Sequence, residues 1–336
     1  MATEQEEPLI VRRTFLAGAG VVLLSAPFAA EGQSAGKVYR IGYLSGASAT
    51  VSPRFVEAFR QALRELGWVE GQNIVIEYRF AEGRFDRLPD LAAELVRRKV
   101  DLIVANLTPT AVAAKNATAT IPIVMINGND PVRLGLVASL ARPGGNVTGV
   151  AYSVGLDILG KLLELLKDAI PRIRRVAVLS DPRNPVQPLQ LESVKGAAQS
   201  LGLELQLLEV RGPADFDRAF AAMVKERAGA YLNLGVAFGV DRMRLAELAV
   251  KHRLPSAYGN RADVEAGGLM SYGPDLIAQV RRAALFVDRI LRGAKPADLP
   301  VEQPTKFELV INMKTVTALR AEIPPSVLLR ATEIIQ

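Results

Sequence analysis

The chain of 336 residues contains no cysteine and only one histidine. Without cysteine it has no disulfides, no thiolate metal sites, no cysteine nucleophile and no N-terminal cysteine for lipid attachment. The single histidine, His252, closes a predicted helix, where its side chain is expected to pair with backbone carbonyls. Most acid–base and metal-site chemistry therefore lacks its usual residues, and we expect neither a metal nor a cofactor.

Common catalytic motifs are also absent from the sequence. It has no Gly-x-x-x-x-Gly-Lys-Ser/Thr phosphate loop, no His-Glu-x-x-His and no Gly-x-Ser-x-Gly turn. The carboxylates that remain for acid–base work are Asp130, Asp181 and Asp263. A carboxylate near a helix N-terminus stays ionised, which favours binding an amine over accepting a proton. The sequence therefore favours a binding protein over an enzyme.

Positive charge is in modest excess and is spread along the chain. The 41 Lys and Arg residues exceed the 35 Asp and Glu residues, for a formal charge of +6. They occur as scattered pairs, such as Arg97-Arg98 and Arg281-Arg282, at the edges of apolar patterns and without interleaved aromatic residues. This distribution is typical of solvated faces, so we expect no nucleic-acid partner.

The N-terminal stretch "VRRTFLAGAGVVLLSAPFAA" has the features of an export signal. Arg12-Arg13 precedes an apolar run, and the order Arg-Arg-x-Phe-Leu is similar to that of twin-arginine signals. A membrane anchor is the alternative, but the run from Phe15 to Ala30 is short for a span and contains Pro27. We therefore expect residues 1–35 to be a cleaved twin-arginine signal and the mature protein to be periplasmic.

Length and hydropathy pattern predict two α/β domains. The chain is too long for one ordinary core, and from Tyr39 onward apolar runs of strand length alternate with segments of helical period. This alternation is typical of parallel sheets with crossover helices. The predicted fold class is α/β, with two doubly wound parallel-sheet lobes joined by crossing segments.

The same pattern gives approximate domain boundaries. Lobe 1 is predicted to contain residues 37–152 plus about 274–293, and lobe 2 residues 153–273 plus about 300–336. The long helical segment 274–293 is expected to return to lobe 1, because chains built from two such lobes often cross back near their end. The extended segment after it is expected to lie in lobe 2.

Three predicted strand ends share one kind of junction, a polar residue followed by proline. They are Thr108-Pro109, Asp130-Pro131 and the pair Asp181-Pro182 and Asn184-Pro185. The polar residue is predicted to be an N-cap and the proline the first helical residue, with a short helix over 131–141. Ligands of parallel sheets bind at the carboxyl ends of strands, and helix N-termini attract anions. The junctions therefore predict an anion site between the lobes, or they only start helices.

Aromatic residues make up only 6% of the chain. Four tyrosines fall at predicted strand ends or lobe junctions, namely Tyr43, Tyr152, Tyr258 and Tyr272. Each is predicted either to stack on a ligand or to pack at the edge of a sheet.

Several segments together resemble a known family. They include "AFRQALRELGWVEGQNIVIEYRFAEG", "DLIVANLTPTAVAA", "IPIVMINGNDPVRLGLVASLARPGGNVTGV" and "KPADLPVEQPTKFELVIN". These segments are similar to ABC-transporter substrate-binding proteins of the group that includes tryptophan and aromatic amino acid receptors. The resemblance extends over nearly all of the chain after the signal.

This resemblance implies a type I periplasmic-binding-protein fold with a ligand in the cleft between its lobes. The ligand-binding residues that it implies are Ser45, Thr108, Pro109, Asp130, Tyr152, Asn184 and Tyr258. At Gly235, within "LNLGVAFGV", the chain departs from relatives that have a polar Asp-Pro, which implies a less polar wall there.

The resemblance also implies a function. It is that of an exported, monomeric receptor that captures an amino acid or an aromatic carboxylate and delivers it to an ABC permease in the inner membrane. One alternative is a periplasmic module that senses a ligand for a signalling partner. Another is an exported α/β enzyme in which Ser45 or Asp130 acts without histidine.

Overall fold

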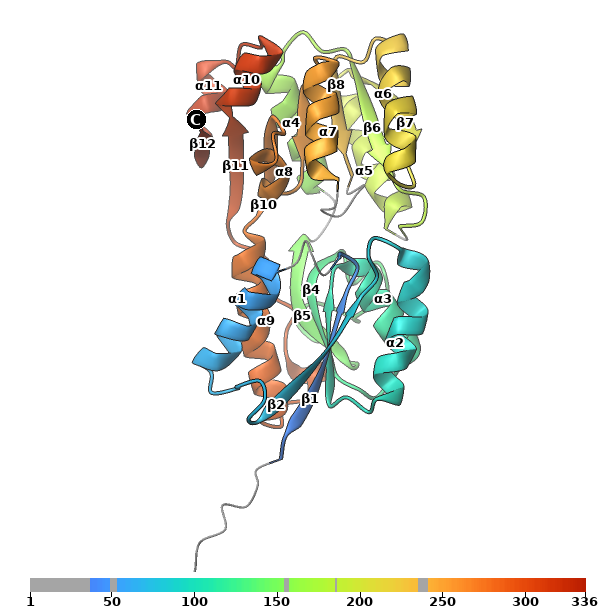
Figure 1. Ribbon diagram of the computed structural model, residues 1–336, viewed down its shortest axis with the longest axis vertical. Helices are drawn as coiled ribbons and strands as arrows, with labels where there is room; N and C mark the ends of the chain where they lie inside the picture. Colours follow the sequence, from blue (N-terminus) through green and yellow to red (C-terminus); the bar gives the residue numbers. More distant parts are fainter. Residues whose placement is uncertain (1–36, 49–52, 154–156, 185, 235–240) are drawn as a thin grey trace, which may run out of the picture. The chain divides into compact units, whose positions relative to one another are not determined.

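The computed structural model describes residues 37–48, 53–153, 157–184, 186–234 and 241–336. These residues form two α/β lobes, each built on its own sheet (Figure 1). No helix within these ranges is both long enough and apolar enough to cross a membrane.

The first sheet has five strands, all parallel, in the order β2-β1-β3-β4-β5. The strands are β1 (Tyr39–Ser45), β2 (Ile74–Phe80), β3 (Leu102–Asn106), β4 (Ile123–Asn129) and β5 (Val147–Ser153). All five residues of β3 are buried. A continuous apolar strand is expected where helices cover both faces of a parallel sheet.

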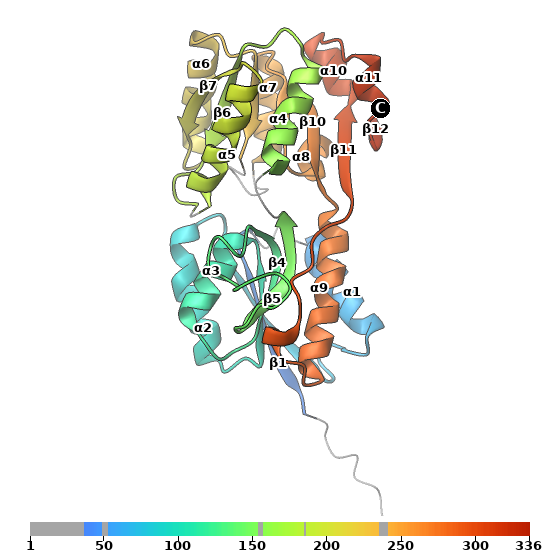
Figure 2. The same ribbon diagram turned by 180° about the vertical axis from the view of Figure 1, so that it is seen from behind.

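Helices cover both faces of this sheet. One face packs on α1 (Pro53–Glu65) and α9 (Leu276–Leu291), through Phe59 and Phe286. The other packs on α2 (Leu88–Arg97), which follows η1 (Phe85–Arg87), and on α3 (Thr108–Ala117). Helix α9 comes from late in the chain, yet it lies beside α1 in both views (Figures 1 and 2). Trp68 Nε1 donates to Asp288 Oδ1 of α9 at 2.9 Å, which ties the helix to the first lobe.

The second sheet has seven strands in the order β12-β11-β10-β9-β8-β6-β7. Only the β10–β11 pair is antiparallel. The strands are β6 (Arg175–Ser180), β7 (Glu204–Glu209), β8 (Ala230–Asn233), β9 (Ser256–Tyr258), β10 (Met270–Pro274), β11 (Phe307–Asn312) and β12 (Glu333–Ile335).

Helices again cover both faces of the second sheet. On one face lie α4 (Asp157–Ala169) and α5 (Gln187–Ser200), and on the other α6 (Phe216–Lys225) and α7 (Arg242–Lys251). The short elements are η2 (Pro213–Asp215), α8 (Arg261–Glu265), η3 (Pro296–Asp298), α10 (Met313–Leu319) and α11 (Pro325–Leu328). The α/β fold class predicted from the alternating pattern is therefore confirmed.

Some local predictions were wrong or incomplete. The sequence pattern did not identify β5 or β12 as strands. It predicted a helix over 131–141, where the structure has turns. Leu136 N–H donates to Pro131 O at 2.8 Å, and Gly135 N–H donates to Val132 O at 2.9 Å. Gly135 has a φ of +66°, which closes the first turn as at a helix C-terminus and prevents a second.

Gly149→Ala should destabilise the first lobe, because β5 approaches β4 too closely there for a side chain. Gly149 has a φ of +127°, and a Cβ at this position would lie 2.1 Å from the Met125 carbonyl oxygen. Backbone strain and overpacking together are expected to lower the free energy of unfolding by about 3 kcal/mol. Urea denaturation measures this change.

Gly196→Ala in α5 is the matched control. A Cβ at Gly196 meets no atom within 4 Å, so the substitution should raise the free energy of unfolding by about 0.5–1 kcal/mol. Equal effects of the two substitutions would contradict the observed pairing of β4 with β5.

Candidate functional site

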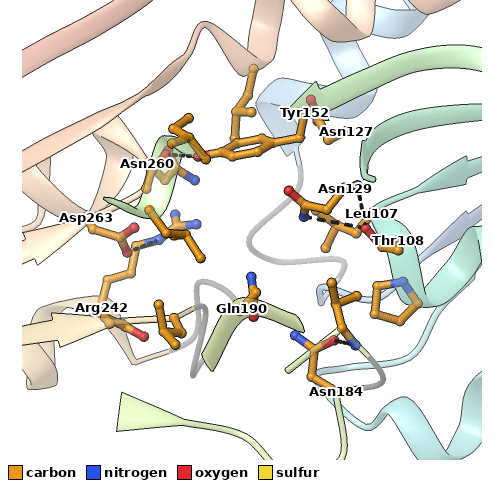
Figure 3. A pocket seen from close by; sticks show the side chains of 18 residues that line it. Leu107, Thr108, Asn127, Asn129, Tyr152, Asn184, Gln190, Arg242, Asn260 and Asp263 are labelled. Atoms are coloured by element: carbon orange, nitrogen blue, oxygen red, sulfur yellow. Dashed lines mark hydrogen bonds and ion pairs between the residues drawn. The ribbon is translucent and has the colours of Figure 1, made fainter. Parts of the chain in front are cut away.

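A pocket of about 150 Å³ lies where strands and helices of both lobes end (Figure 3). An engineered protein cavity of about this volume holds a benzene ring. The first lobe and α9 contribute Leu107, Thr108, Pro109, Asn127, Asn129, Tyr152 and Leu276. The second lobe contributes Ile158, Leu159, Asn184, Val186, Gln190, Asn233, Leu234, Arg242, Gly259, Asn260 and Asp263. The lining is therefore apolar with several side-chain amides and one pair of charges.

The end of β3 forms one part of the first-lobe wall. Helix α3 begins at Thr108, and its N-cap is Leu107, with φ 83° and ψ 156°. Such angles are normally restricted to glycine. Leu107 N–H donates to Ile126 O at 2.8 Å, and Thr110 Oγ1 donates to Leu107 O at 2.7 Å. These two hydrogen bonds hold the strained residue in place.

The predicted cap of this helix was wrong by one residue. Thr108 was expected as N-cap and Pro109 as the first helical residue, but they are the first and second helical residues. The Thr108 hydroxyl does not cap its own helix. It accepts the backbone N–H of Asn129 at 2.8 Å, so it connects the ends of β3 and β4.

The end of β4 contains a β-bulge at the pocket. The pairing with β5 skips Asn127, because Ile126 pairs with Val150 and Gly128 pairs with Ala151. Asn127 has a φ of 57° and is 2% exposed. Its Oδ1 has no hydrogen-bond partner among the residues that the structure describes.

Tyr152 at the end of β5 reaches across to the second lobe. Its hydroxyl donates to the Gly259 carbonyl oxygen at 2.6 Å. Burial raises the pKa of this hydroxyl well above its usual range, so Tyr152 stays a neutral donor. A Cβ at Gly259 would lie 2.8 Å from the Tyr152 hydroxyl, and a Cβ at Gly273 would lie 2.2 Å from the Gly259 carbonyl oxygen, so a side chain at either position would disturb this hydrogen bond.

The second-lobe wall carries the charges. Arg242 Nε donates to Asp263 Oδ1 at 3.0 Å, and the two side chains are 18% and 17% exposed. Burial raises the pKa of Asp263 to about 6, although the nearby Arg242 opposes the shift. These are the only formally charged side chains among the described residues that line the pocket. An anionic and a cationic group could each find a partner here.

The structure brings four of the predicted site residues to this pocket, namely Thr108, Pro109, Tyr152 and Asn184. Asn184 is buried, and its Oδ1 accepts the Val186 N–H at 3.1 Å. Of the four tyrosines noted in the sequence, only Tyr152 lines the pocket. Tyr43 is fully buried in the first core, and Tyr272 stacks on Phe307.

Three other predicted residues do not line the pocket, and their contacts explain why. Ser45 is fully buried, and its Oγ accepts the Ala47 N–H at 3.2 Å. Tyr258 is buried, and its hydroxyl is hydrogen-bonded to that of Tyr231. Asp130 lies on the turn after β4, where Oδ1 accepts the Arg133 N–H at 3.4 Å. Gly235 lies outside the described residues.

The prediction of three helix starts around an anion was largely wrong. The residues directly after Asp130 form turns and not a helix. Helix α5 begins at Gln187, three residues after Asn184. The Asp181 carboxylate instead accepts two hydrogen bonds from the Arg183 guanidinium, at 2.9 and 2.7 Å. Of the three predicted junctions, Thr108-Pro109 alone lies at the start of a helix.

Sequence reasoning missed Asn127 and Arg242. Asn127 follows an apolar run and precedes Gly128, a combination that signals a bulge or turn but not its direction. Arg242 stands in "DRMRLAEL" beside several other charged residues and has the local pattern of a solvated helix face. Its packing against Asp263, 21 residues later, depends on the fold.

Comparisons with known proteins agree with this architecture. A family model described as ABC transporter substrate binding protein matches residues 49–335. A tyrosine-binding protein of Clostridioides difficile (strain R20291) is 29% identical over 263 residues, which are 78% of this chain and 75% of that protein.

Two solved structures are similar over most of their length. A conserved domain protein from Vibrio cholerae has a TM-score of 0.81 and 28% identity, covering 89% of this chain and 100% of that one. An ABC domain from Streptococcus pneumoniae in complex with L-Trp has a TM-score of 0.80 and 27% identity, covering 88% of this chain and 99% of that one.

Ionisation of the buried Asp263 carboxyl is expected to lower the unfolding free energy of the protein as the pH rises from about 4 to about 6. Its pKa in the folded protein is about 6, against about 3.9 in an unfolded chain, so the folded state holds the proton more tightly. In this window the wild type should lose up to about 3 kcal/mol of unfolding free energy relative to Asp263→Asn. Above it the difference stays constant. Urea denaturation across this range measures the difference.

Asp217→Asn is the control, because it removes an exposed carboxylate that pairs with Arg244 at 2.8 Å outside the pocket. It subtracts the general effect of replacing a carboxylate by an amide. If the unfolding free energy of the wild type instead rose relative to that of Asp263→Asn as the pH rose, the attraction of Asp263 to Arg242 would outweigh the effect of its burial. The direction assigned to the pKa shift of Asp263 would then be wrong.

Proposed function

Because this chain belongs to the ABC transporter substrate-binding protein family and has the type I periplasmic-binding-protein fold, we propose that it is an exported solute receptor. It captures a small ligand, an amino acid or another aromatic or carboxylate compound, in the pocket. It then delivers the ligand to a permease in the inner membrane.

The observation that carries this proposal is the partly buried Arg242–Asp263 pair in an otherwise neutral, largely apolar pocket. The Arg242 guanidinium matches a ligand carboxylate with parallel hydrogen bonds, and Asp263 matches an ammonium group. The ring-sized volume beside them suits an apolar or aromatic side chain. The relatives named for tyrosine and solved with L-Trp have ligands of this chemistry.

Thr108, Tyr152 and Asn184 are the other proposed contacts. Thr108 Oγ1 accepts an N–H from Asn129, so its own O–H is left to donate to a ligand oxygen. Tyr152 supplies an aromatic face, and Asn184 supplies an amide from the second lobe. A ligand that touches both walls stabilises the arrangement in which both are close.

Polar contacts between the lobes among the described residues include the Tyr152–Gly259 hydrogen bond and two exposed ion pairs. Arg54 pairs with Glu265 at 3.1 Å and Arg133 with Glu192 at 2.7 Å. Exposed ion pairs of this kind contribute about 0–1 kcal/mol each. A ligand of micromolar affinity supplies about 8 kcal/mol, which is several times the contribution of these ion pairs. The permease then recognises the closed receptor.

Export is part of the proposal, and the twin-arginine order at Arg12-Arg13 supports it. The mature receptor works in the periplasm, as a monomer, without a metal or an organic cofactor. Fractionation of the producing cells and the N-terminal sequence of the purified protein test this part independently of ligand binding.

Arg242→Ala should weaken the binding of a carboxylate ligand. The protein is screened by thermal shift against amino acids and aromatic acids, and the dissociation constant of the best ligand is measured by calorimetry. Loss of a charge-assisted hydrogen-bonded pair of this kind is expected to raise Kd about 100-fold. Asp263→Asn should weaken the binding of ligands that carry an ammonium group. It should leave the affinity for ligands without an ammonium group unchanged.

Arg244→Ala is the matched control on the same helix, since Arg244 is exposed and pairs with Asp217. It should leave Kd unchanged. Equal affinity of the Arg242→Ala variant and the wild type would remove the proposed carboxylate contact. Turnover of the bound compound would instead favour an enzyme.

A further inference from the structure

Two side-chain amides at the start of α5 line the second-lobe wall of the pocket. They belong to Asn184, which lies three residues before the helix, and to Gln190, near the helix start. Neither amide nitrogen donates a hydrogen bond within the part of the chain that the structure describes, and neither is cut off from solvent. Figure 3 shows the Gln190 amide directed into the pocket. Both nitrogens can therefore contact a ligand.

A backbone N–H fixes the orientation of a neighbouring amide, that of Gln187. Asp181 N–H donates to Gln187 Oε1 at 3.0 Å. Because a backbone N–H can only donate, the amide end that faces it must be the oxygen. Gln187 is 3% exposed and is not among the described residues that line the pocket. Its NH2 group is therefore the end that it can offer to Gln190.

This orientation determines that of Gln190 in turn. Gln187 Nε2 donates to Gln190 Oε1 at 3.2 Å. An NH2 group can only donate, so the oxygen of Gln190 faces Gln187 and the NH2 group of Gln190 is left for the pocket. Asn184 has the same polarity by a different route, since its Oδ1 accepts the Val186 N–H at 3.1 Å. The wall at α5 therefore presents two uncharged hydrogen-bond donors.

Two donors of fixed polarity are complementary to an oxygen of the ligand. A ligand that fills the pocket displaces water from these nitrogens, so it either pairs with them or leaves buried donors without a partner. A carboxylate or an uncharged carbonyl oxygen accepts such N–H groups. An ammonium group has only N–H donors and cannot pair with them.

We propose that Gln190 is a specificity-determining residue that donates a hydrogen bond to a ligand oxygen. Gln187 is the positioning residue that fixes this polarity, and it acts from outside the pocket. The oxygen belongs to a carboxylate or to an uncharged carbonyl group, which share the same acceptor chemistry. This inference rests on the proposed function, because it takes the pocket as the ligand site.

Gln190→Met tests the contact directly, because it keeps the length of the side chain and removes the donor. Three probes share a phenyl ring: L-phenylalanine has a carboxylate, 3-phenylpropionamide has an uncharged carbonyl, and 2-phenylethylamine has no oxygen. Calorimetry on the full-length mature protein should show binding of the first two probes weakened about tenfold by the substitution. The affinity for 2-phenylethylamine should not fall.

Gln187→Glu tests the positioning role through its dependence on pH. A protonated carboxyl at this position accepts the Asp181 N–H and donates its O–H to Gln190 Oε1, as the amide does. An ionised carboxylate has no donor and attracts the NH2 group of Gln190, which turns the Gln190 oxygen toward the pocket. Relative to the wild type at the same pH, affinity for L-phenylalanine should be unchanged near about pH 5 and about tenfold weaker near about pH 8.5.

Gln206→Met is the matched control for both substitutions. Gln206 is 7% exposed, lies on β7 away from the pocket lining and donates to Ala222 O at 3.1 Å. Its replacement should leave the dissociation constants of all three probes unchanged. A pH-independent loss of affinity in Gln187→Glu would reduce Gln187 to a structural residue and overturn its positioning role.

The remaining outcomes separate this inference from the proposed function. If Gln190→Met weakens L-phenylalanine and 3-phenylpropionamide, Gln190 binds either kind of oxygen, and if it weakens L-phenylalanine alone, Gln190 binds the carboxylate. Equal weakening of all three probes, or of none, overturns the role of Gln190. A loss of L-phenylalanine affinity in Arg242→Ala would then still support the receptor. If none of the three probes binds the wild type, the proposed function and this inference both fail.

Discussion

Parallel pairing of β3, β4 and β5 is the constraint on which the first-lobe wall depends. Parallel strands have their carboxyl ends at one edge of the sheet, so the residues that follow them converge. At this edge the chain takes unusual backbone conformations at non-glycine residues, with φ of 83° at Leu107, 57° at Asn127 and 39° at Asp130. Strain of this kind persists only where surrounding contacts enforce it, and it concentrates at binding sites. The hydrogen bond from Asn129 N–H to Thr108 Oγ1 is one such contact.

The two lobes contribute different chemistry to the pocket. The first lobe supplies neutral groups, namely the Thr108 hydroxyl, the Asn127 amide and the Tyr152 ring, on a rigid strand edge. The second lobe supplies Arg242 and Asp263, which pair with each other at 3.0 Å. Each charge thereby compensates the other, which avoids the larger cost of an isolated buried charge. A ligand with both charges can replace each partner without leaving either residue uncompensated.

Predictions from sequence were most accurate where a local pattern repeats. The apolar run "DLIVAN" followed by "TPTAVAAKNA" predicted β3 and α3, because continuous burial and helical period are properties of neighbouring residues. They failed where conformation depends on single backbone angles. The helix expected after Asp130 does not form because Gly135 takes a positive φ. The pattern of a polar residue followed by proline identified two residues of the pocket, Thr108 and Asn184. It misplaced the helix start at both positions.

The sequence by itself determined the alternation of strands and helices, the α/β class and the family resemblance, because these depend on patterns that extend over many residues. Only the tertiary structure decided which polar residues share the pocket. Arg242 meets Asp263 because β9 and α8 place the aspartate beside the start of α7, and Asn127 faces the pocket because a bulge in β4 interrupts the alternation of the strand. Both relations depend on contacts between segments, and the residues next to each other in the chain do not encode them.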